Sequence, residues 1–286
     1  MSTDKSQARD MPKSNSLMIA IIGTSFDPWR SVFEYGQCKT WLRNLNLKCE
    51  VLYLTCKYSG LISRTINRII EFLRWNSGKK ASYAVAYTLM YWLFPFRGIV
   101  PTPMRIREDA ISDSTSITYL QIRCPEMLTA LRWKKISMLR YFLRSGASYL
   151  LFVNPSTYVS IKNLEQFIQT KTTSHQKYVY AGHIANSADS QFVVGSFILL
   201  NRNTAELLLK GRFRIPTHTL DDVAFGKFLA DCKVEAEEIE TLTISQTQDL
   251  ARIPDSNIVN FRIKVPSVRR VKDEITIMKH LETKLP

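Results

Sequence analysis

Residues 149–164 read Tyr-Leu-Leu-Phe-Val-Asn-Pro-Ser-Thr-Tyr-Val-Ser-Ile-Lys-Asn-Leu, and this stretch decides the predicted fold. The apolar run at 149–153 has the length and composition of a buried strand. It ends at the triplet Asn154-Pro155-Ser156, where proline and its polar neighbours break regular structure. A β-rich piece follows at 157–159, and a helix is expected over 160–169. The stretch therefore predicts a strand, a rigid turn, a short strand and a helix.

Alternating strands and helices are predicted on both sides of this stretch. The apolar run at 16–23 indicates a strand buried on both faces, followed by a helix over 30–45 and a strand over 49–55. A strand–helix–strand order implies parallel strands with a right-handed crossover. Further strands are expected at 118–122, 177–183, 191–201, 237–243 and 257–264, helices at 124–145, 203–210 and 220–232, and a loop at 107–116. The chain is therefore predicted to be an α/β protein.

Two segments stand apart from this alternation. Residues 1–15 are polar and lack the apolar core of a signal peptide, so we expect a disordered tail ahead of a single domain over 16–286. Residues 61–98 combine a basic amphipathic stretch with an aromatic-rich run that is shorter than the roughly 20 residues of a transmembrane helix. This insert is either a helical pair packed on the sheet or an interfacial membrane element.

The net charge of +14 requires anionic partners or a solvated basic surface. No RNA- or DNA-binding fingerprint is present, so nucleic acid is disfavoured as a partner, and a diphosphate ligand with an anionic membrane surface accounts better for the charge. The five cysteines are scattered without a Cys-x-x-Cys pair, which indicates free thiols in a reducing compartment rather than a zinc site. We expect a cytoplasmic protein, peripheral at the inner face of the membrane.

Short motifs follow one another in a fixed order through residues 18–264. They are Arg30 ahead of Lys39-Thr40-Trp41, then Thr157-Tyr158-Val159, Tyr180-Ala181-Gly182, Gly195-Ser196 before an apolar run, Asp221-Asp222-Val223, and Asn260-Phe261-Arg262. In this order the chain resembles the Fringe-like and β1,3-galactosyltransferase-like glycosyltransferases of the GT-A type. The resemblance implies a Rossmann-like, mostly parallel central sheet with helices on both faces. It also implies inverting transfer of a sugar from a nucleotide sugar, expected to be a UDP-sugar, to a glycan or glycolipid acceptor, as in polysaccharide or glycoconjugate assembly.

The chain departs from the family at its metal site. The family's acidic triplet is replaced by Asn154-Pro155-Ser156, the second glycine of Gly-Ser-Gly by Phe197, and a late histidine by Asn260. An amide and a hydroxyl oxygen bind Mn²⁺ or Mg²⁺ poorly, because these ions prefer carboxylate ligands. We therefore expect no metal cofactor, with Mn²⁺ or Mg²⁺ as the disfavoured alternative. Cationic side chains would then neutralise the diphosphate, and the candidates are Arg30, Lys39, Lys134, Lys135, Arg262 and Lys264.

The resemblance also implies roles for individual residues. Asp222 is expected to be the catalytic base with Asp221 as its supporting acid, and His183 is expected at the acceptor site. The expected donor-binding residues are Thr24, Arg30, Lys39, Lys134, Asn154, Ser156, Gly195 and Ser196. Aspartate at a helix start is also a common cap, and a histidine near a strand end is commonly structural. The alternative function is therefore a non-catalytic protein that binds glycan or nucleotide sugar, or that serves as a partner subunit.

Overall fold

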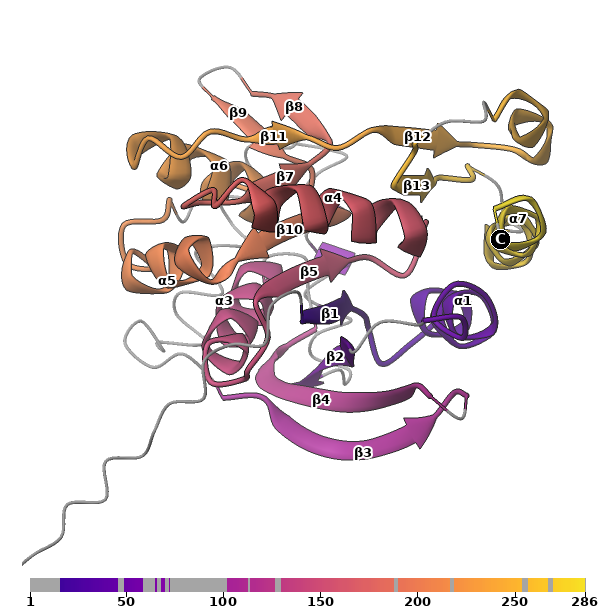
Figure 1. Cartoon of the computed structure of the whole chain (residues 1–286). Coiled ribbons are helices and arrows are strands. Elements are labelled where there is room, and N and C mark those ends of the chain that lie inside the picture. Colours follow the sequence, from indigo (N-terminus) through magenta and orange to yellow (C-terminus); the bar gives the residue numbers. More distant parts are fainter. Residues whose placement is uncertain are drawn as a thin grey trace, which may run out of the picture.

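The computed structural model describes residues 16–45, 49–58, 65, 68, 69, 72, 102–112, 114–126, 130–187, 190–216, 219–253, 257–266 and 270–285. The predicted tail at 1–15 and nearly all of the predicted insert at 61–98 lie outside these residues. Figure 1 shows a layered arrangement in which a large sheet lies between groups of helices.

The large sheet has the strand order β11-β7-β10-β5-β1-β2-β4-β3. Its strands β5, β1, β2 and β4 pair in parallel, whereas β10 is antiparallel to both β5 and β7, and β3 is antiparallel to β4. The strands are β1 (Leu17–Ile22), β2 (Cys49–Tyr58), β3 (Met104–Ala110), β4 (Ser116–Pro125), β5 (Tyr149–Val153), β7 (Tyr180–Gly182), β10 (Phe197–Asn201) and β11 (Glu237–Glu238). The α/β prediction is confirmed, and the sheet is mixed.

Helices cover both faces of this sheet. They are α1 (Trp29–Tyr35), α3 (Leu131–Phe142), α4 (Ile161–Thr173), α5 (Arg202–Lys210), α6 (Asp221–Asp231) and α7 (Arg270–Lys284). Alternate residues of β1 enter two separate cores: Leu17 and Ile19 pack with α1, α4 and α7, whereas Met18 and Ala20 pack with α3, α5 and α6. Burial on both faces explains why β1 is apolar throughout, without a polar alternation.

A small sheet lies beyond the carboxyl end of β5, with the order β12-β13-β6. Its strands are β6 (Thr157–Val159), β12 (Thr241–Ile244) and β13 (Asn260–Ile263), and a separate hairpin pairs β8 (Ile184–Asn186) with β9 (Gln191–Val193). Two 3₁₀ turns, η1 (Gln37–Lys39) and η3 (Thr247–Arg252), complete the described elements. Helix α7 packs beside the small sheet, where the Tyr158 hydroxyl donates to Glu282 Oε2 at 2.9 Å.

Several sequence predictions need correction. Residues 107–116 were expected to be a loop, but β3 ends at Ala110 within them and pairs with β4. The helix expected over 124–145 begins only at Leu131, because Cys124 and Pro125 extend β4 along β2. The single strand expected over 191–201 is divided into β9 and β10, and the helix expected over 30–45 into α1 and η1. Helix α7 was not predicted.

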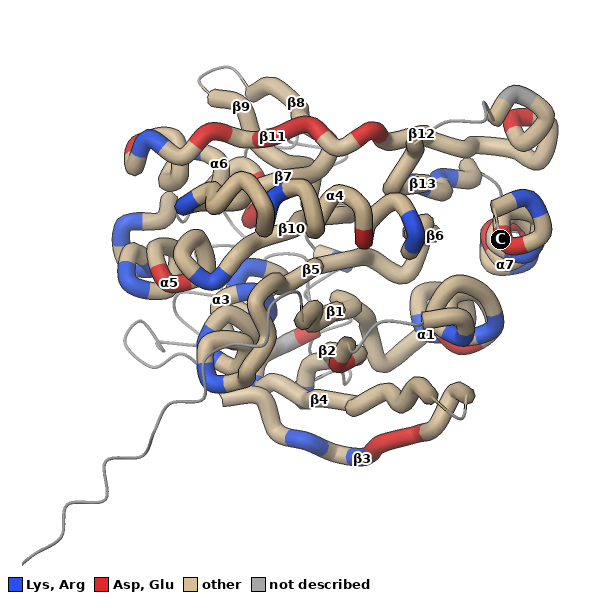
Figure 2. Tube along the Cα trace, in the orientation of Figure 1, with Lys and Arg blue, Asp and Glu red and all other residues tan. Residues whose placement is uncertain are grey.

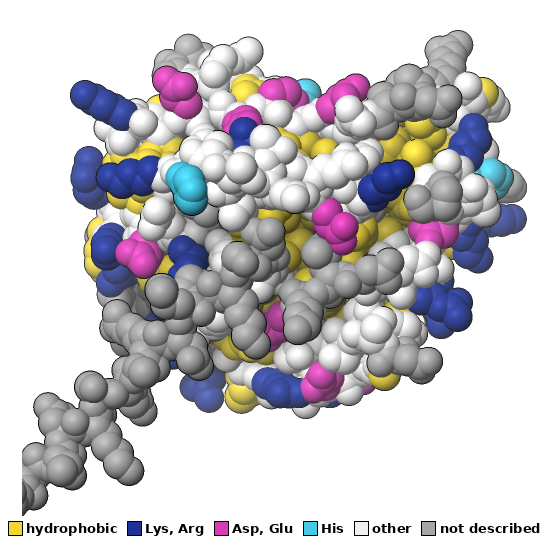
Figure 3. All heavy atoms as spheres, in the orientation of Figure 1, with side chains coloured by type: hydrophobic (Ala, Val, Ile, Leu, Met, Phe, Trp, Pro, Cys, Tyr) yellow, Lys and Arg dark blue, Asp and Glu magenta, His cyan; other side chains and the backbone are white. Residues whose placement is uncertain are grey.

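The charged residues follow the elements unevenly. Figure 2 shows Lys and Arg on α5, α1 and α7, and acidic residues along β11. In the face shown in Figure 3, the coloured Lys and Arg side chains are spread along both sides of the molecule, with Asp and Glu among them. Within the described part of the chain, no helix is both long enough and apolar enough to cross a bilayer.

Candidate functional site

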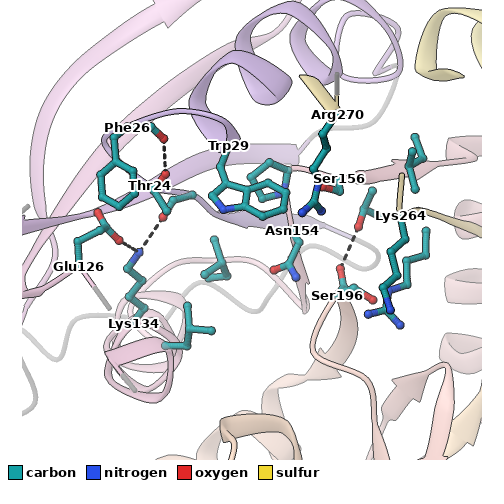
Figure 4. Close-up of a pocket in the computed structure, with 17 residues that line it drawn as sticks. Thr24, Phe26, Trp29, Glu126, Lys134, Asn154, Ser156, Ser196, Lys264 and Arg270 are labelled. Atoms are coloured by element: carbon teal, nitrogen blue, oxygen red, sulfur yellow. Dashed lines mark hydrogen bonds and ion pairs between the residues drawn. The ribbon is translucent and has the colours of Figure 1, made fainter. Parts of the chain in front are cut away.

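A cavity of about 470 Å³ opens at the carboxyl ends of β1 and β5. From β1 the chain passes through α1 to β2 on one side, whereas β5 joins β1 on the other side after α3. Such a reversal of strand order leaves a crevice at the sheet edge, where α/β proteins bind ligands. The cavity is lined by Ile22, Gly23, Thr24, Phe26, Trp29, Glu126, Leu131, Lys134, Asn154, Pro155, Ser156, Thr157, Ser196, Arg262, Ile263, Lys264 and Arg270 (Figure 4).

The Asn154-Pro155-Ser156 turn forms one wall of the cavity. The backbone N–H of Asn154 donates to the backbone carbonyl of Ser196 at 3.0 Å. The side-chain amide of the fully buried Gln37 donates to the backbone carbonyl of Asn154 at 2.9 Å. These contacts join segments that lie about 40 and 120 residues apart in sequence. The structure therefore brings Asn154, Ser156 and Ser196, all expected to bind the donor, to one wall.

Four cations and one carboxylate line the cavity: Lys134, Arg262, Lys264, Arg270 and Glu126. Arg262 and Lys264 project from β13 and from the residue after it, and neither forms an ion pair with another residue that the structure describes. Two of the cationic side chains that were expected to neutralise the diphosphate are therefore available to an anion. An anionic ligand would meet an excess of positive charge at this wall.

Lys134 is buried with its own counter-ion. It forms an ion pair with Glu126, and its ammonium donates to the Gly23 carbonyl at 2.7 Å. Burial opposes the charge on Lys134, but the Glu126 carboxylate and the ionisable thiol of Cys56 outweigh this effect, so the Lys134 pKa is raised. Glu126 in turn accepts the Cys56 amide at 3.1 Å. Lys134 stays charged, and it fixes the loop after β1 while Glu126 compensates its charge.

Arg270, at the start of α7, is held on two sides. Its Nε donates to Glu274 Oε1 at 2.6 Å, and its guanidinium carbon lies 4.2 Å from the centre of the Trp29 ring. Glu274 is fully buried and accepts the Ser156 hydroxyl at 2.8 Å. Because Nε is the only guanidinium nitrogen that bonds a described residue, the two terminal amino groups can serve a ligand. Figure 4 shows Arg270 pointing toward Ser156 and Asn154.

Asp221 and Asp222 lie behind the cavity wall, at the start of α6. Asp222 Oδ2 accepts the Gly195 amide at 3.0 Å, and Asp222 Oδ1 accepts the Val223 amide at 2.8 Å. Lys135 Nζ lies 2.6 Å from Asp221 Oδ2. Burial raises the pKa of Asp222, as does the charge of Asp221, while Lys135 and the two amides oppose the shift. Asp222 is half-buried and is linked to the cavity through Gly195, the neighbour of Ser196.

The remaining predicted residues are divided between the cavity and the surface. Thr24 lines the cavity, and its hydroxyl donates to the Phe26 carbonyl at 2.6 Å. Arg30 pairs with Glu34 at 2.9 Å, and Lys39 is exposed on η1; neither is among the described residues that line the cavity. His183 Nδ1 lies 3.0 Å from Glu238 Oε1 beside the β7–β11 edge, also outside the cavity lining that the structure describes.

Sequence reasoning missed Trp29, Glu126 and Arg270. Arg270 opens a helix whose buried face has a helical spacing, Ile277, Met278 and Leu281, and this pattern is the signal that could have revealed α7. Glu126 follows a long strand, but nothing local distinguishes it from a surface acid. In the residues that the structure describes, no three His, Cys, Asp or Glu side chains gather as a metal site would require.

No known protein family matches the chain, and no curated protein matches it either.

Proposed function

We propose that this protein binds a nucleotide sugar, with a UDP-sugar as the expected donor, in the cavity between β1 and β5. The sugar is then transferred to a hydroxyl of a glycan or glycolipid acceptor, without a divalent metal and within a GT-A-like fold. The observation that carries the proposal is the cavity itself. It lies at the reversal of strand order and combines Arg262, Lys264 and Arg270 with the aromatic rings of Phe26 and Trp29.

The meeting of distant motifs supports the GT-A-like assignment. The strand, breaker, short strand and helix expected over 149–169 correspond to β5, the Asn-Pro-Ser turn, β6 and α4. The Gly195-Ser196 pair contacts both the Asn154-Pro155-Ser156 turn and the Asp221-Asp222 pair. The Ser196 carbonyl accepts from the Asn154 backbone N–H, and the Gly195 backbone N–H donates to Asp222. Three motifs that the resemblance places in one site are thus in direct contact, although about 70 residues separate the first from the last.

The cations of the cavity fit a diphosphate. A nucleoside diphosphate leaves with negative charge on its phosphate oxygens, and the enzyme must neutralise that charge for transfer to proceed. Arginine presents a planar fork that bonds phosphate in two places, and lysine acts as a point charge. Arg270, Arg262 and Lys264 together would supply the positive charge that a divalent metal supplies elsewhere, and the apolar wall at Phe26 and Leu131 would take the nucleobase.

In the proposed reaction, the acceptor hydroxyl attacks the anomeric carbon of the donor sugar. A bond forms between that carbon and the acceptor oxygen, and the bond to the diphosphate oxygen breaks with its electron pair leaving on the diphosphate. The hydroxyl proton passes to the Asp222 carboxylate. Each oxygen of Asp222 accepts only one described hydrogen bond and keeps a second lone pair for this proton. A raised pKa makes Asp222 a stronger base once it is ionised.

A second candidate function is nucleotide-sugar binding without transfer. The observation that favours it is the position of Asp222, which braces Gly195 from behind the wall and is absent from the described cavity lining. A carboxylate in that position can have a purely structural role, in which it only stabilises the start of α6 and the 195–196 segment. The two candidates share a donor site and differ in turnover.

A thermal-shift panel of nucleotides and nucleotide sugars in EDTA, combined with a product assay, tests the proposal. A ligand at 100 times its dissociation constant stabilises the folded state by about 2.7 kcal/mol. We expect UDP or another nucleoside diphosphate to raise the midpoint, and Arg262→Ala to reduce the shift. The exposed Lys162→Ala on α4 should leave it unchanged. If no nucleotide shifts the midpoint of the wild type, the proposal is wrong. A shift without transfer or donor hydrolysis favours the non-catalytic candidate.

A further inference from the structure

Two cysteines of neighbouring strands meet near the end of the sheet that carries the cavity. Cys56 of β2 and Cys124 of β4 are buried on the α3 side of the sheet, and their sulfurs lie 2.9 Å apart. The strand register shifts between Cys56 and Tyr58, so the two side chains are not simple cross-strand partners. Cys38, Cys49 and Cys232 have no such sulfur neighbour among the residues that the structure describes.

The distance between the sulfurs is short for two free thiols. A disulfide bond is about 2.05 Å long, so a displacement of less than about 1 Å would join the pair. Both thiols lie on adjacent parallel strands of one sheet and point to the same core, so no element has to move past another. Lys134 lies close enough to the Cys56 sulfur to favour its ionised form, although burial has the larger effect. Each thiol thus has the other within reach for disulfide formation, and a cation lies nearby.

The surroundings of the two cysteines also determine how fast their thiols can be oxidised. Burial raises the pKa of the Cys56 thiol well above its ordinary range, and the hydrogen bond with Cys124 raises it further, whereas Lys134 opposes the shift. Since the thiolate is the nucleophile, little of the reactive form is present at neutral pH. Only a small oxidant can reach two thiols that are 0% and 4% exposed.

We propose that Cys56 and Cys124 form a reversible intramolecular disulfide, with hydrogen peroxide as the oxidant. The thiolate of one cysteine attacks a peroxide oxygen, the O–O bond breaks, and a sulfenic acid forms while the released hydroxide takes up a proton as water. The thiolate of the other cysteine attacks the sulfenic sulfur, the S–S bond forms, and a second water leaves. Two thiols and one peroxide give one disulfide and two waters, and a dithiol reductant restores the thiols.

The test is a thiol map of the full-length protein after treatment with graded peroxide. The protein is denatured in N-ethylmaleimide, and its mass and peptides are measured before and after dithiothreitol. We expect the loss of two alkylated thiols together and a peptide pair that joins Cys56 to Cys124, both reversed by dithiothreitol. The rate should rise with pH between pH 7 and 9, because the thiolate fraction of Cys56 increases as the pH approaches its raised pKa.

Two variants sharpen the experiment. Cys56→Ala should leave Cys124 alkylated at peroxide levels that oxidise the wild type, whereas Cys38→Ala, a buried thiol elsewhere in the core, should still form the disulfide. The map of the wild type decides the question even if Cys56→Ala fails to fold. The proposal is overturned if Cys56 and Cys124 stay alkylatable while the half-buried Cys49 or Cys232 is oxidised. It is also overturned if Cys56 or Cys124 forms a disulfide with a cysteine outside this pair.

Discussion

At the residue scale, Glu274 links Arg270 to Ser156, two residues that line the cavity. It accepts hydrogen bonds from the Nε of Arg270 and from the hydroxyl of Ser156, a residue at a position where the proposed GT-A-like assignment expects an acid. The charge of Arg270 is thereby placed beside the Asn154-Pro155-Ser156 turn. Under the proposed function, this fixed cation would take the place of a metal ion, which a neutral turn would bind poorly.

Replacing Arg270 tests this substitution. Charge-assisted hydrogen bonds contribute roughly 1.5–3 kcal/mol, so Arg270→Ala should weaken UDP binding by tenfold or more in calorimetry. Arg270→Lys should recover only part of the loss, because lysine lacks the planar fork and stacks less well on Trp29. Lys279→Ala, an exposed cation on the same helix, is the matched control. Equal affinities for Arg270→Ala and Lys279→Ala would remove Arg270 from the site.

Replacing Asp222 separates transfer from folding. Asp222→Asn keeps the shape of the side chain, but its single carbonyl oxygen can accept only one of the Gly195 and Val223 amides, so stability should fall by roughly 0.5–1.5 kcal/mol, the contribution of one hydrogen bond. A positioned base contributes about 10² to 10⁴ in rate, and that factor should be lost while UDP binding persists. A transfer rate within a few-fold of wild type would place the base elsewhere.

The same variant reports the pKa of Asp222 through its pH dependence. The pKa is raised in the folded protein, so Asp222 contributes stability below its ordinary pKa of about 3.9, and this contribution is lost as pH rises through the folded value. We therefore expect urea unfolding to show Asp222→Asn gaining stability relative to wild type between pH 4 and pH 7. A relative gain by the wild type would mean that the pKa is lowered instead.

Sequence reasoning predicted the cavity residues unevenly, and the reason is physical. Thr24, Asn154 and Ser156 follow apolar strands, and the ends of parallel strands meet at one edge, so their convergence could be foreseen. Arg270 and Trp29 reach the cavity through the packing of α7 on α1, which no local pattern encodes. Arg30 and Lys39 were expected in the site because of their place in a motif, yet α1 directs Arg30 to Glu34.

At the element scale, α7 is the part of the fold that sequence reasoning lacked. Its residues Ile277, Met278 and Leu281 are fully buried against the core that contains α1 and the small sheet. Edge strand β3 was missed for a different reason: its apolar residues Met104 and Ile106 alternate with arginine over only four positions, and charged residues follow, as suits an exposed sheet edge that avoids further pairing. The buried strands, by contrast, were located from their apolar runs alone.

Loosening α7 should therefore disturb both stability and binding. Leu281→Ala removes a fully buried side chain, and such changes cost about 2–5 kcal/mol. Because Arg270 stands on the same helix, UDP affinity should fall as well, although Leu281 itself is not among the described residues that line the cavity. Urea unfolding and calorimetry on the same sample measure the two effects. Full UDP affinity in a clearly destabilised variant would show that Arg270 is positioned independently of the rest of α7.

At the scale of the whole molecule, the net charge of +14 and the cavity can be considered together. The basic side chains of the face in Figure 3 are spread along its two sides, whereas Arg262, Lys264 and Arg270 meet in one cavity with apolar and aromatic walls. Under the proposed function, these grouped cations would bind a small anionic ligand. The central claim of the proposed function is that these cations bind a nucleoside diphosphate without the help of a metal.

Calorimetric titration of UDP into the full-length protein, first in EDTA and then in Mn²⁺, tests that claim most directly. The account predicts measurable binding in EDTA, an affinity that Mn²⁺ changes by less than about tenfold, or roughly 1.4 kcal/mol, and a loss of binding when Arg262, Lys264 and Arg270 are all replaced by alanine. Binding that appears only with Mn²⁺, or that survives the triple replacement, would contradict it.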